Sequence, residues 1–512
     1  MGRALLPIRP KNAVVIGAGI AGLSAALRLA HAGLQVRVID LHDQPGGKMR
    51  TVPSDAGPVD AGPTVMTMRH VFETLFEDIG ERLSDHVTLH REETLARHFW
   101  PDGSQLDLFD DPERSASAIG NFAGDRSERE FRQFQSKARA LFDGFEQPMM
   151  MAASPSFAGL VRHVVTRPNL ARLMAPGKTL ARALAQQFSD PRLRQLFGRY
   201  ATYVGGSPYQ SPSLLSLIWE SEARGVWRVE GGMHKLAQAM HDLAKARGAE
   251  FHFGIAASRI EKQGSAVSAV HLSDGRKLPA DLVVFNGDPR ALAQGFLGEA
   301  ATSTIPADSV EPRSLSAWVW SFAAKPSGVD LAHHNVFFGQ DPRSEFDPIK
   351  QGKMPEDPTL YICAQDRGGD TPSGLERFEI IMNAPANMPG SQEEIDLCRA
   401  TTFPILRQRG LAFSEEPPDH ALSTPAIFNS LFPASGGSLY GLSPHGMMAA
   451  FKRPTVRSSL KGLYLAGGGV HPGAGIPMAC LSGQHAAAAI LNDLTSTSMS
   501  PKMATRGGMS TA

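Results

Sequence analysis

The chain has 512 residues, of which 42% are hydrophobic and 20% are charged, and its 51 basic and 51 acidic residues cancel. This length is too great for a single hydrophobic core, and the zero net charge provides no general attraction to nucleic acid. The three cysteines have neither metal-ligand spacing nor an even count, which is typical of a reducing compartment. No stretch of about 18 uninterrupted apolar residues occurs, so we expect a protein that is cytoplasmic or lies peripherally on a membrane.

Residues 14–40 have the pattern of a strand, a glycine-rich turn, a helix and a second strand that ends on an acidic residue. Gly17 permits a tight turn, Gly19 lets the backbone approach a pyrophosphate, and Gly22 lets the helix pack close to the strand. The carboxylate of Asp40 can accept hydrogen bonds from the ribose hydroxyls of adenosine. The segment therefore predicts a dinucleotide-binding βαβ unit.

The loop after this unit combines a double glycine, Gly46 and Gly47, with the cations Lys48 and Arg50. The glycines allow the loop to fold back over a cofactor, and either cation can meet a phosphate. A plain surface turn is the alternative interpretation of this loop.

Residues 125–200 are helical in pattern, and their second half is basic. From residue 151 to residue 200 there are eight Lys or Arg residues and one acidic residue, Asp190, with apolar residues interleaved. A basic amphipathic segment is typical of an element that lies on a membrane surface. A solvated helical insertion that packs on its own domain is the alternative.

Strands and helices alternate again after residue 227, as a parallel α/β sheet does when it resumes after an insertion. We expect a hairpin over 96–103, helices over 236–245 and 478–491, and strands over 251–260, 281–285, 315–323 and 376–383. The polar tail after Asn492 is predicted to be disordered.

The nucleotide-binding sheet begins near residue 14, resumes near 228 and closes near 463–490. Such a split assembly is typical of a large flavin site, since nicotinamide dehydrogenases usually complete the nucleotide domain in one stretch. No second strand-linked Gly-x-Gly-x-x-Gly motif is present, so we expect the flavin to pass electrons to oxygen or a quinone. No metal site is expected, because the adjacent His333 and His334 should point to opposite faces of a strand.

Four segments resemble, in chain order, the motifs of bacterial-type carotenoid desaturases, the phytoene desaturase-like flavoproteins. These segments are residues 59–64, 227–233, 280–289 and 463–483. In the last block the chain has Gly468 where the family favours alanine and Val470 where it favours threonine, which removes a hydroxyl group. Residues 251–260 also resemble the family's adenine-side strand, where the backbone of Ala257 would meet the cofactor.

The resemblance implies an α/β fold with a split Rossmann-type FAD-binding domain, formed by residues 1–70, 228–290 and 458–494. We also expect a mixed α+β substrate domain (71–124, 201–227 and 291–457). The composition further predicts a helical, membrane-associating insertion (125–200) and a disordered tail (495–512). The cofactor is FAD, and its expected binding residues are Gly17, Gly19, Gly22, Asp40, Gly46, Gly47, Lys48, Gly62, Thr64, Ala257, Gly467, Gly468, Ile476, Pro477 and Met478.

Within the family, residues 62–67 and 95–104 look most like the 1-hydroxycarotenoid 3,4-desaturases. The likeness implies an acyclic carotenoid substrate with a tertiary hydroxyl or methoxy group. We expect the enzyme to be cytoplasmic and to lie peripherally on the inner face of the membrane. The implied chemistry needs no strong base and we name none; His471 either acts as an acid or base or orients the flavin loop. The alternatives are a phytoene-type desaturase, a carotenoid oxygenase, or a prenyl-chain carrier of the same fold that lacks flavin.

Overall fold

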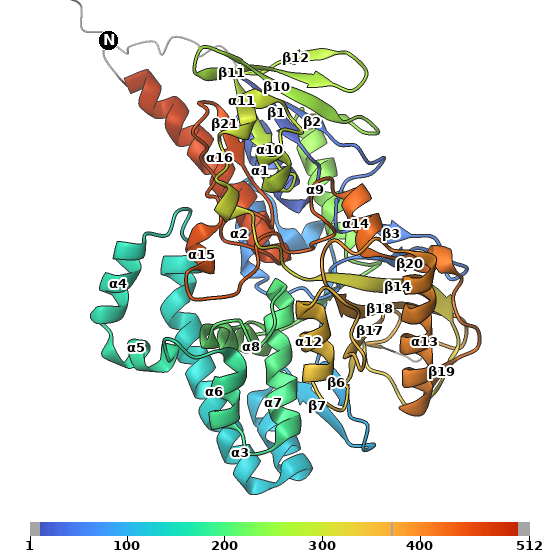
Figure 1. Ribbon diagram of the computed structural model, residues 1–512. Coiled ribbons are helices and arrows are strands. Elements are labelled where there is room, and N and C mark those ends of the chain that lie inside the picture. The colour runs from blue at the N-terminus through green and yellow to red at the C-terminus, as the bar shows by residue number, and fades with distance from the viewer. Residues whose placement is uncertain (1–10, 370–371, 500–512) are drawn as a thin grey trace, which may run out of the picture.

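The computed structural model describes residues 11–369 and 372–499 (Figure 1). A parallel five-stranded sheet has the order β21-β13-β1-β2-β9. Its strands are β1 (Asn12–Ile16), β2 (Gln35–Ile39), β9 (Glu250–His252), β13 (Leu282–Phe285) and β21 (Leu463–Leu465). Pieces that lie far apart in the sequence thus form one sheet, and the α/β fold class is confirmed.

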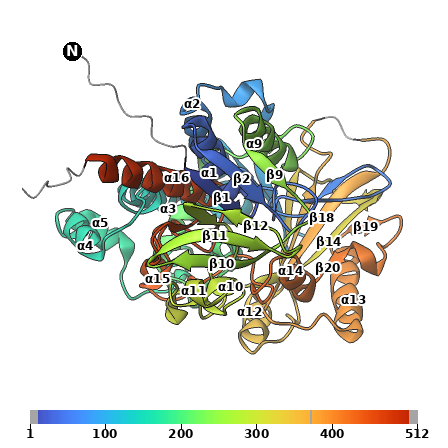
Figure 2. The same ribbon diagram turned by 90° about the horizontal axis from the view of Figure 1, so that it is seen from above.

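Three helices pack together beside this sheet, namely α1 (Ile20–His31), α9 (His234–Ala246) and α16 (Ile476–Met499) (Figure 2). The close packing of α16 on α1 depends on Gly483, because a Cβ atom there would lie 2.1 Å from the carbonyl oxygen of Ala21. The short helix α2 (His70–Glu77) also packs on α16, and Val71 and Phe72 join the core of this domain. The core therefore extends beyond the boundary that we expected at residue 70.

The expected single strand over residues 251–260 is wrong. Gly254 adopts a positive φ of 69°, and its N–H group donates a hydrogen bond to the carbonyl of His42, so the extended backbone is interrupted. The chain leaves the parallel sheet after β9 and forms an antiparallel sheet from β10 (Ala257–Gln263), β11 (Ala266–Leu272) and β12 (Lys277–Pro279).

A second large sheet has the order β20-β14-β18-β17-β16-β6-β7. Its strands are β6 (Thr94–Phe99), β7 (Gln105–Phe109), β14 (Ser316–Ala324), β16 (His334–Phe337), β17 (Leu360–Ala364), β18 (Glu376–Ala384) and β20 (Leu422–Ser423). The hairpin predicted around residues 96–103 and the two β-rich runs are confirmed by β6, β7, β14 and β18. The helix α13 (Gln392–Gln408) covers this sheet through a core that includes Phe403 (Figure 1).

The helical part begins at residue 112 rather than 125. It contains α3 (Pro112–Phe145), α4 (Phe157–Val165), α5 (Pro168–Met174), α6 (Leu180–Gln187), α7 (Pro191–Gly198) and α8 (Leu217–Ala223). The side chain of Asp111 caps the start of α3, and Gly124 kinks the helix at a positive φ. Trp219 of α8 packs on Phe131 of α3 in a core that also includes residues of β6 and β7. These helices therefore share a core with the end of the large sheet.

The disorder expected after Asn492 is wrong for residues 493–499, which continue α16. The hydroxyl of Thr495 donates to the carbonyl of Leu491, and that of Ser496 donates to the carbonyl of Asn492. These bonds satisfy the polar side chains on the helix itself. The rest of the predicted tail lies outside the described residues.

Among the described residues, no helix combines the length and the apolar character needed to cross a membrane.

Candidate functional site

A cavity of about 680 Å³ lies between the parallel sheet and the seven-stranded sheet. Its lining includes Ile16, Ile39 and Phe285, which stand at the carboxyl ends of β1, β2 and β13. Ligands of open parallel sheets bind at these strand ends. The cavity continues to one face of the large sheet, so a cofactor and a second molecule can meet inside it.

The structure brings most of the expected cofactor residues to this cavity. Its lining includes Gly17, Gly19, Asp40, Gly46, Gly47, Lys48, Gly62, Thr64, Ala257, Gly467, Gly468 and Ile476. Gly22, Pro477 and Met478 are not part of the lining. Pro477 and Met478 follow Ile476 in the first turn of α16, whose N-terminal end thus borders the cavity.

The glycine turn leaves space and open N–H groups for a phosphate. Gly17 has a φ of 103°, which residues with a side chain rarely adopt, and a Cβ atom on Gly22 would lie 2.0 Å from the carbonyl oxygen of Gly17. Gly19 is the N-cap of α1, and no side chain caps this helix. The first N–H groups of α1 are therefore available to an anion, and the helix dipole favours a negative charge there.

Asp40 is buried at the end of β2 and is held in one orientation. Its Oδ2 accepts a hydrogen bond from the N–H of Ala18 at 2.6 Å, and its Oδ1 accepts one from the N–H of His42 at 2.8 Å. Because a carboxylate oxygen can accept more than one hydrogen bond, Asp40 retains acceptor capacity for ribose hydroxyls. Its contact with the ribose stays a prediction.

The two cations of the following loop reach toward the substrate domain. The Nζ of Lys48 donates to the carbonyl of Leu439 at 2.6 Å, and a terminal nitrogen of Arg50 donates to Ser423 Oγ at 2.6 Å. Lys48 is open to the cavity but is enclosed by protein around it, and this desolvation lowers its pKa to about 8. Contact of either cation with a phosphate stays a prediction.

Asn286 lies at the centre of the glycine turn but was not among the expected site residues. Its Nδ2 donates to the carbonyl of Gly17 at 3.2 Å, and a Cβ atom on Gly19 would lie 2.9 Å from the same nitrogen. The sequence does carry a signal for it: Asn286 directly follows the strand at 282–285, so it must stand at the same sheet edge as the glycine turn.

Arg453 supports the last glycine segment, and no sequence motif pointed to this residue. Its guanidinium donates to the carbonyls of Gly468, Tyr440 and Leu442 at 2.8, 2.9 and 2.8 Å, respectively.

His471 is buried outside the cavity lining, and its Nε2 donates to the carbonyl of Ala152 at 2.8 Å. This contact ties the terminal loop to the helical part, as the orienting role would require.

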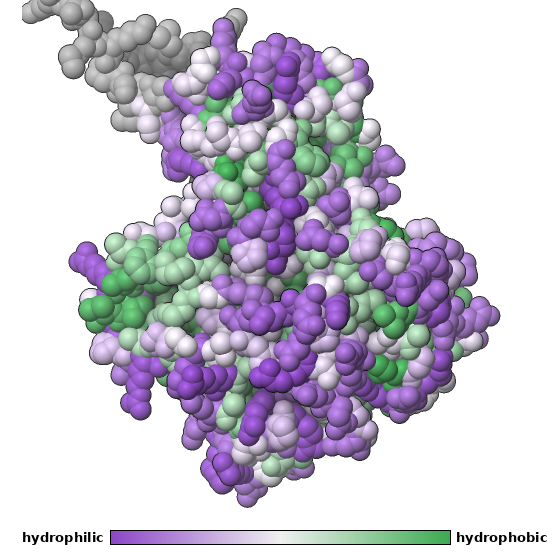
Figure 3. Space-filling model, in the orientation of Figure 1, coloured by the Kyte–Doolittle hydropathy of each residue, from purple (hydrophilic) through white to green (hydrophobic). Residues whose placement is uncertain are grey.

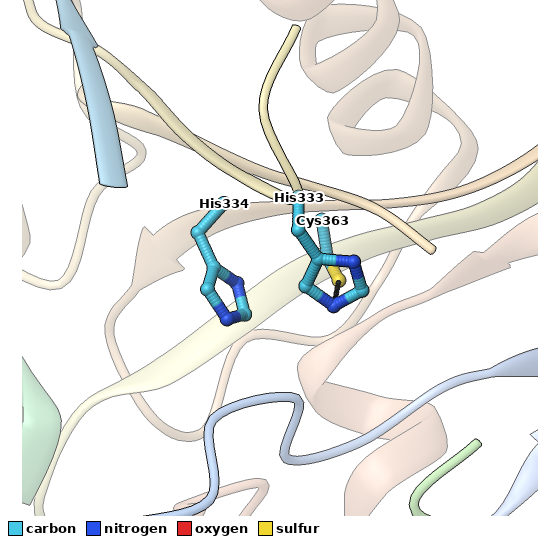
Figure 4. A group of neighbouring side chains, drawn as sticks. All are labelled: His333, His334 and Cys363. Atoms are coloured by element: carbon cyan, nitrogen blue, oxygen red, sulfur yellow. Dashed lines mark hydrogen bonds between the residues drawn. The ribbon is translucent and has the colours of Figure 1, made fainter. Parts of the chain in front are cut away.

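The prediction that His333 and His334 point to opposite faces is wrong. His333 precedes β16, so its side chain does not follow the alternation of side chains along that strand. The centres of the two rings lie 4.6 Å apart (Figure 4). The Nε2 of His333 lies 3.5 Å from Cys363 Sγ, and the ligand atoms of the three residues lie within 4.8 Å of one another. Burial lowers the pKa of both histidines and raises the pKa of the Cys363 thiol, so all three are neutral.

The residues present fit FAD. Gly17, Gly19 and Gly22 have no room for side chains, the start of α1 is uncapped, and a fixed carboxylate follows β2. These three features match the pyrophosphate and the ribose of a dinucleotide. The remaining cavity is wide enough to reach the face of the large sheet that carries Tyr361 and Ile381.

Comparison with known proteins agrees with this geometry. The family model of flavin containing amine oxidoreductases matches residues 20–334. The hydroxyneurosporene desaturase of Cereibacter sphaeroides is 55% identical over 486 residues, which cover 95% of this chain and 98% of that protein. The protein of the same name from Rhodobacter capsulatus is 52% identical, with coverages of 94% and 98%.

Solved structures with low sequence identity share the fold. An oxidoreductase from Methanosarcina mazei has a TM-score of 0.61 at 15% identity, with 94% of this chain and 100% of that chain covered. A mutant putrescine oxidase has a TM-score of 0.60 at 14% identity, with coverages of 95% and 100%. Fold and site together define an oxidoreductase that uses FAD. The chain belongs to the bacterial carotenoid desaturase family, as the resemblance of its motifs implied.

Proposed function

We propose that the protein introduces the C3–C4 double bond into acyclic carotenoids that carry a hydroxyl or methoxy group on C1. The observation that carries this proposal is the 55% identity, over 95% of the chain, to a relative named hydroxyneurosporene desaturase. The likeness of residues 62–67 and 95–104 to 1-hydroxycarotenoid 3,4-desaturases supports it, and Gly62–Val65 line the cavity.

The chemistry suits an apolar cavity beside a flavin. The C4–H bond is allylic to the polyene, so the positive charge left by hydride loss is delocalised, and proton loss from C3 completes the double bond. FAD, when bound, supplies the hydride acceptor. The protein holds one C–C bond in place and excludes water, and Val319, Ile381 and Phe428 in the cavity wall suit a hydrocarbon chain.

We infer oxygen or a quinone as the final electron acceptor, because the sequence has no second strand-linked glycine motif for a nicotinamide cofactor. The test is to reduce the purified protein anaerobically with substrate and then add oxygen or a quinone. Return of the oxidised flavin spectrum with either acceptor supports the inference. Return of the oxidised spectrum only after a nicotinamide nucleotide is added would contradict the inference.

Substrate choice tests the proposed reaction. We expect the initial rate on 1-hydroxyneurosporene to exceed the rate on neurosporene in identical micelles by a factor of up to about 10⁴, the usual scale when a site hydrogen-bonds a hydroxyl group. A cavity that measures only chain length would discriminate by roughly 10- to 200-fold per methylene. Comparable rates, or desaturation elsewhere along the chain, would favour a phytoene-type desaturase; an oxygenated product would favour an oxygenase.

We also propose that an apolar patch around α4 docks on an anionic membrane, where carotenoids reside. The patch consists of Phe157, Val161, Val165, Met447 and Met448, which are 53%, 43%, 72%, 48% and 44% exposed, respectively. Figure 3 shows apolar residues gathered over α4. The exposed Arg162, Arg167 and Arg172 lie on α4, at the turn after it and on α5, and each can contribute on the order of 1 kcal/mol beside an anionic leaflet.

The membrane proposal is tested with vesicles of anionic and of neutral lipid. Binding to anionic vesicles should weaken with salt and with the triple change of Arg162, Arg167 and Arg172 to Glu. A triple change of Arg114, Arg126 and Arg276 to Glu provides a matched control, because these arginines lie outside residues 151–200. Equal binding by the two triple variants would refute the proposal.

A further inference from the structure

The large sheet presents two chemically different faces. On β14, β17 and β18 the even-numbered residues, such as Trp318, Ile362 and Ile380, belong to the hydrophobic core. Alternate residues of a strand point to opposite faces. The odd-numbered residues therefore point to the opposite face, and those that line the cavity include Val319, Tyr361, Glu379, Ile381 and Asn383. The face is partly polar although the proposed substrate is a hydrocarbon along most of its length.

Glu379 differs from its polar neighbours on this face. Asn383 donates from Nδ2 to Glu345 Oε1 at 2.7 Å, and the hydroxyl of Tyr361 lies 2.7 Å from Thr64 Oγ1. Glu379 is 0% exposed, and neither of its carboxyl oxygens has a hydrogen-bond partner among the described residues. An unpaired buried polar group is destabilising, so its presence in a cavity wall calls for a ligand that pairs with it.

The surroundings favour the protonated form of the Glu379 carboxyl. Burial, with the negative charge of Asp60 as a smaller cause, raises the pKa of Glu379 well above its usual value, and the positive charge of Arg50 opposes this only in part. A protonated carboxyl group has an O–H donor and a carbonyl acceptor. It can therefore donate to an ether oxygen, which an ionised carboxylate cannot do.

We propose that Glu379 binds the oxygen atom on C1 of the substrate. The inference rests on the proposed function. That oxygen is separated from C3 by only three bonds, so the group that binds it must stand beside the reacting C3–C4 bond, in the part of the cavity that FAD and substrate share. A hydroxyl oxygen and a methoxy oxygen both accept a hydrogen bond, so a protonated carboxyl accounts for both kinds of substrate.

Arg199 also lines the cavity and has an unpaired Nε, but its charge already interacts with neighbouring protein groups. Its guanidinium lies 5.5 and 5.1 Å from the ring centres of Tyr200 and Tyr203. Both tyrosine hydroxyls donate to the carboxylate of Glu222, so this arginine belongs to a paired network. Glu379 has no such network.

The test uses three variants of the full-length flavoprotein. Glu379→Leu removes both hydrogen-bonding atoms, and Glu379→Gln keeps a donor and an acceptor but cannot take a proton. Ile381→Val is the matched control, since it changes the shape of the same face two residues away on the same strand. Flavin content and the initial rates on 1-hydroxyneurosporene, its 1-methoxy derivative and neurosporene are measured for each.

Glu379→Leu should retain flavin and lose at least about 100-fold in rate on the two oxygenated substrates, while its rate on neurosporene changes by less than about threefold. Glu379→Gln should keep the preference for the oxygenated substrates within about tenfold. Ile381→Val should change the three rates by a common factor.

The proposal is overturned if Glu379→Leu keeps the substrate preference of the parent protein. It is also overturned if Glu379→Gln loses as much rate as Glu379→Leu, which would indicate proton abstraction, or if both variants lose flavin, which would indicate a role in cofactor binding. An unmodified protein that shows no preference for oxygenated carotenoids contradicts the proposed function itself.

Discussion

A methyl group at Gly22 should weaken FAD binding although Gly22 does not line the cavity. In Gly22→Ala the new Cβ atom would lie 2.0 Å from the carbonyl oxygen of Gly17 and 2.8 Å from Asn286 Nδ2. A distance of 2.0 Å is far inside van der Waals contact, and the obstructing atom belongs to the backbone. Either α1 or the glycine turn must therefore move.

The size of the effect follows from the strain. Overpacking of this kind costs about 1–3 kcal/mol. If the turn moves rather than the helix, this cost weakens FAD binding by a factor of roughly 5 to 150. We expect the turn to yield, because α1 is held on its other side by the contact between Gly483 and the backbone of Ala21.

The assay is the ratio of flavin to protein absorbance after purification, together with the FAD dissociation constant of the reloaded apoprotein. Gly374→Ala is the comparison, because its Cβ atom would meet nothing within 4 Å and Gly374 does not line the cavity. That variant should keep its flavin and should be about 0.4–1 kcal/mol more stable, since alanine restricts the unfolded chain. Full flavin occupancy and unchanged affinity in Gly22→Ala would refute the reasoning.

Three further predictions follow from other contacts. Gly19→Val should lose flavin, because its side chain fills the approach to the pyrophosphate; a full flavin spectrum would contradict this. Because the pKa of Glu379 is raised, the unfolded chain releases this proton first, so the contribution of Glu379 to stability falls as pH rises above about 4.5. Glu379→Gln should reduce that fall in a melting series over pH 4–8, and an identical slope would count against it. Changing Arg162, Arg167 and Arg172 to Glu should reduce sedimentation with anionic vesicles and leave flavin content unchanged; equal sedimentation would count against docking.

Much of the parallel sheet could be predicted from the sequence, because its signals are local. The glycine turn, the buried strand before it and the acidic residue at position 40 each depend on a few neighbouring residues. The hairpin around the Asp102–Gly103 turn is local in the same way. The break at Gly254 was missed because the apolar pattern continues through it, and only the pairing with His42 shows that the backbone turns.

The cavity wall could not be predicted, because it depends on contacts between distant segments. Glu379 lies in a run of alternating residues that reads as an ordinary strand, and nothing in that run tells which face meets the cofactor. Arg453 joins three carbonyl groups of two segments, at residues 440–442 and at residue 468, and its role follows only from their arrangement in space. Asn286 was within reach of the sequence, since it ends a predicted strand at the edge that carries the glycine turn.

Anaerobic incubation of the purified flavoprotein with 1-hydroxyneurosporene tests the central claim most directly. The account predicts that the oxidised flavin absorbance bleaches as the carotenoid spectrum shifts to longer wavelength, with one double bond formed at C3–C4 for each flavin reduced. A flavin that stays oxidised while the carotenoid remains unchanged would contradict the account, as would bleaching accompanied by a product desaturated at another position.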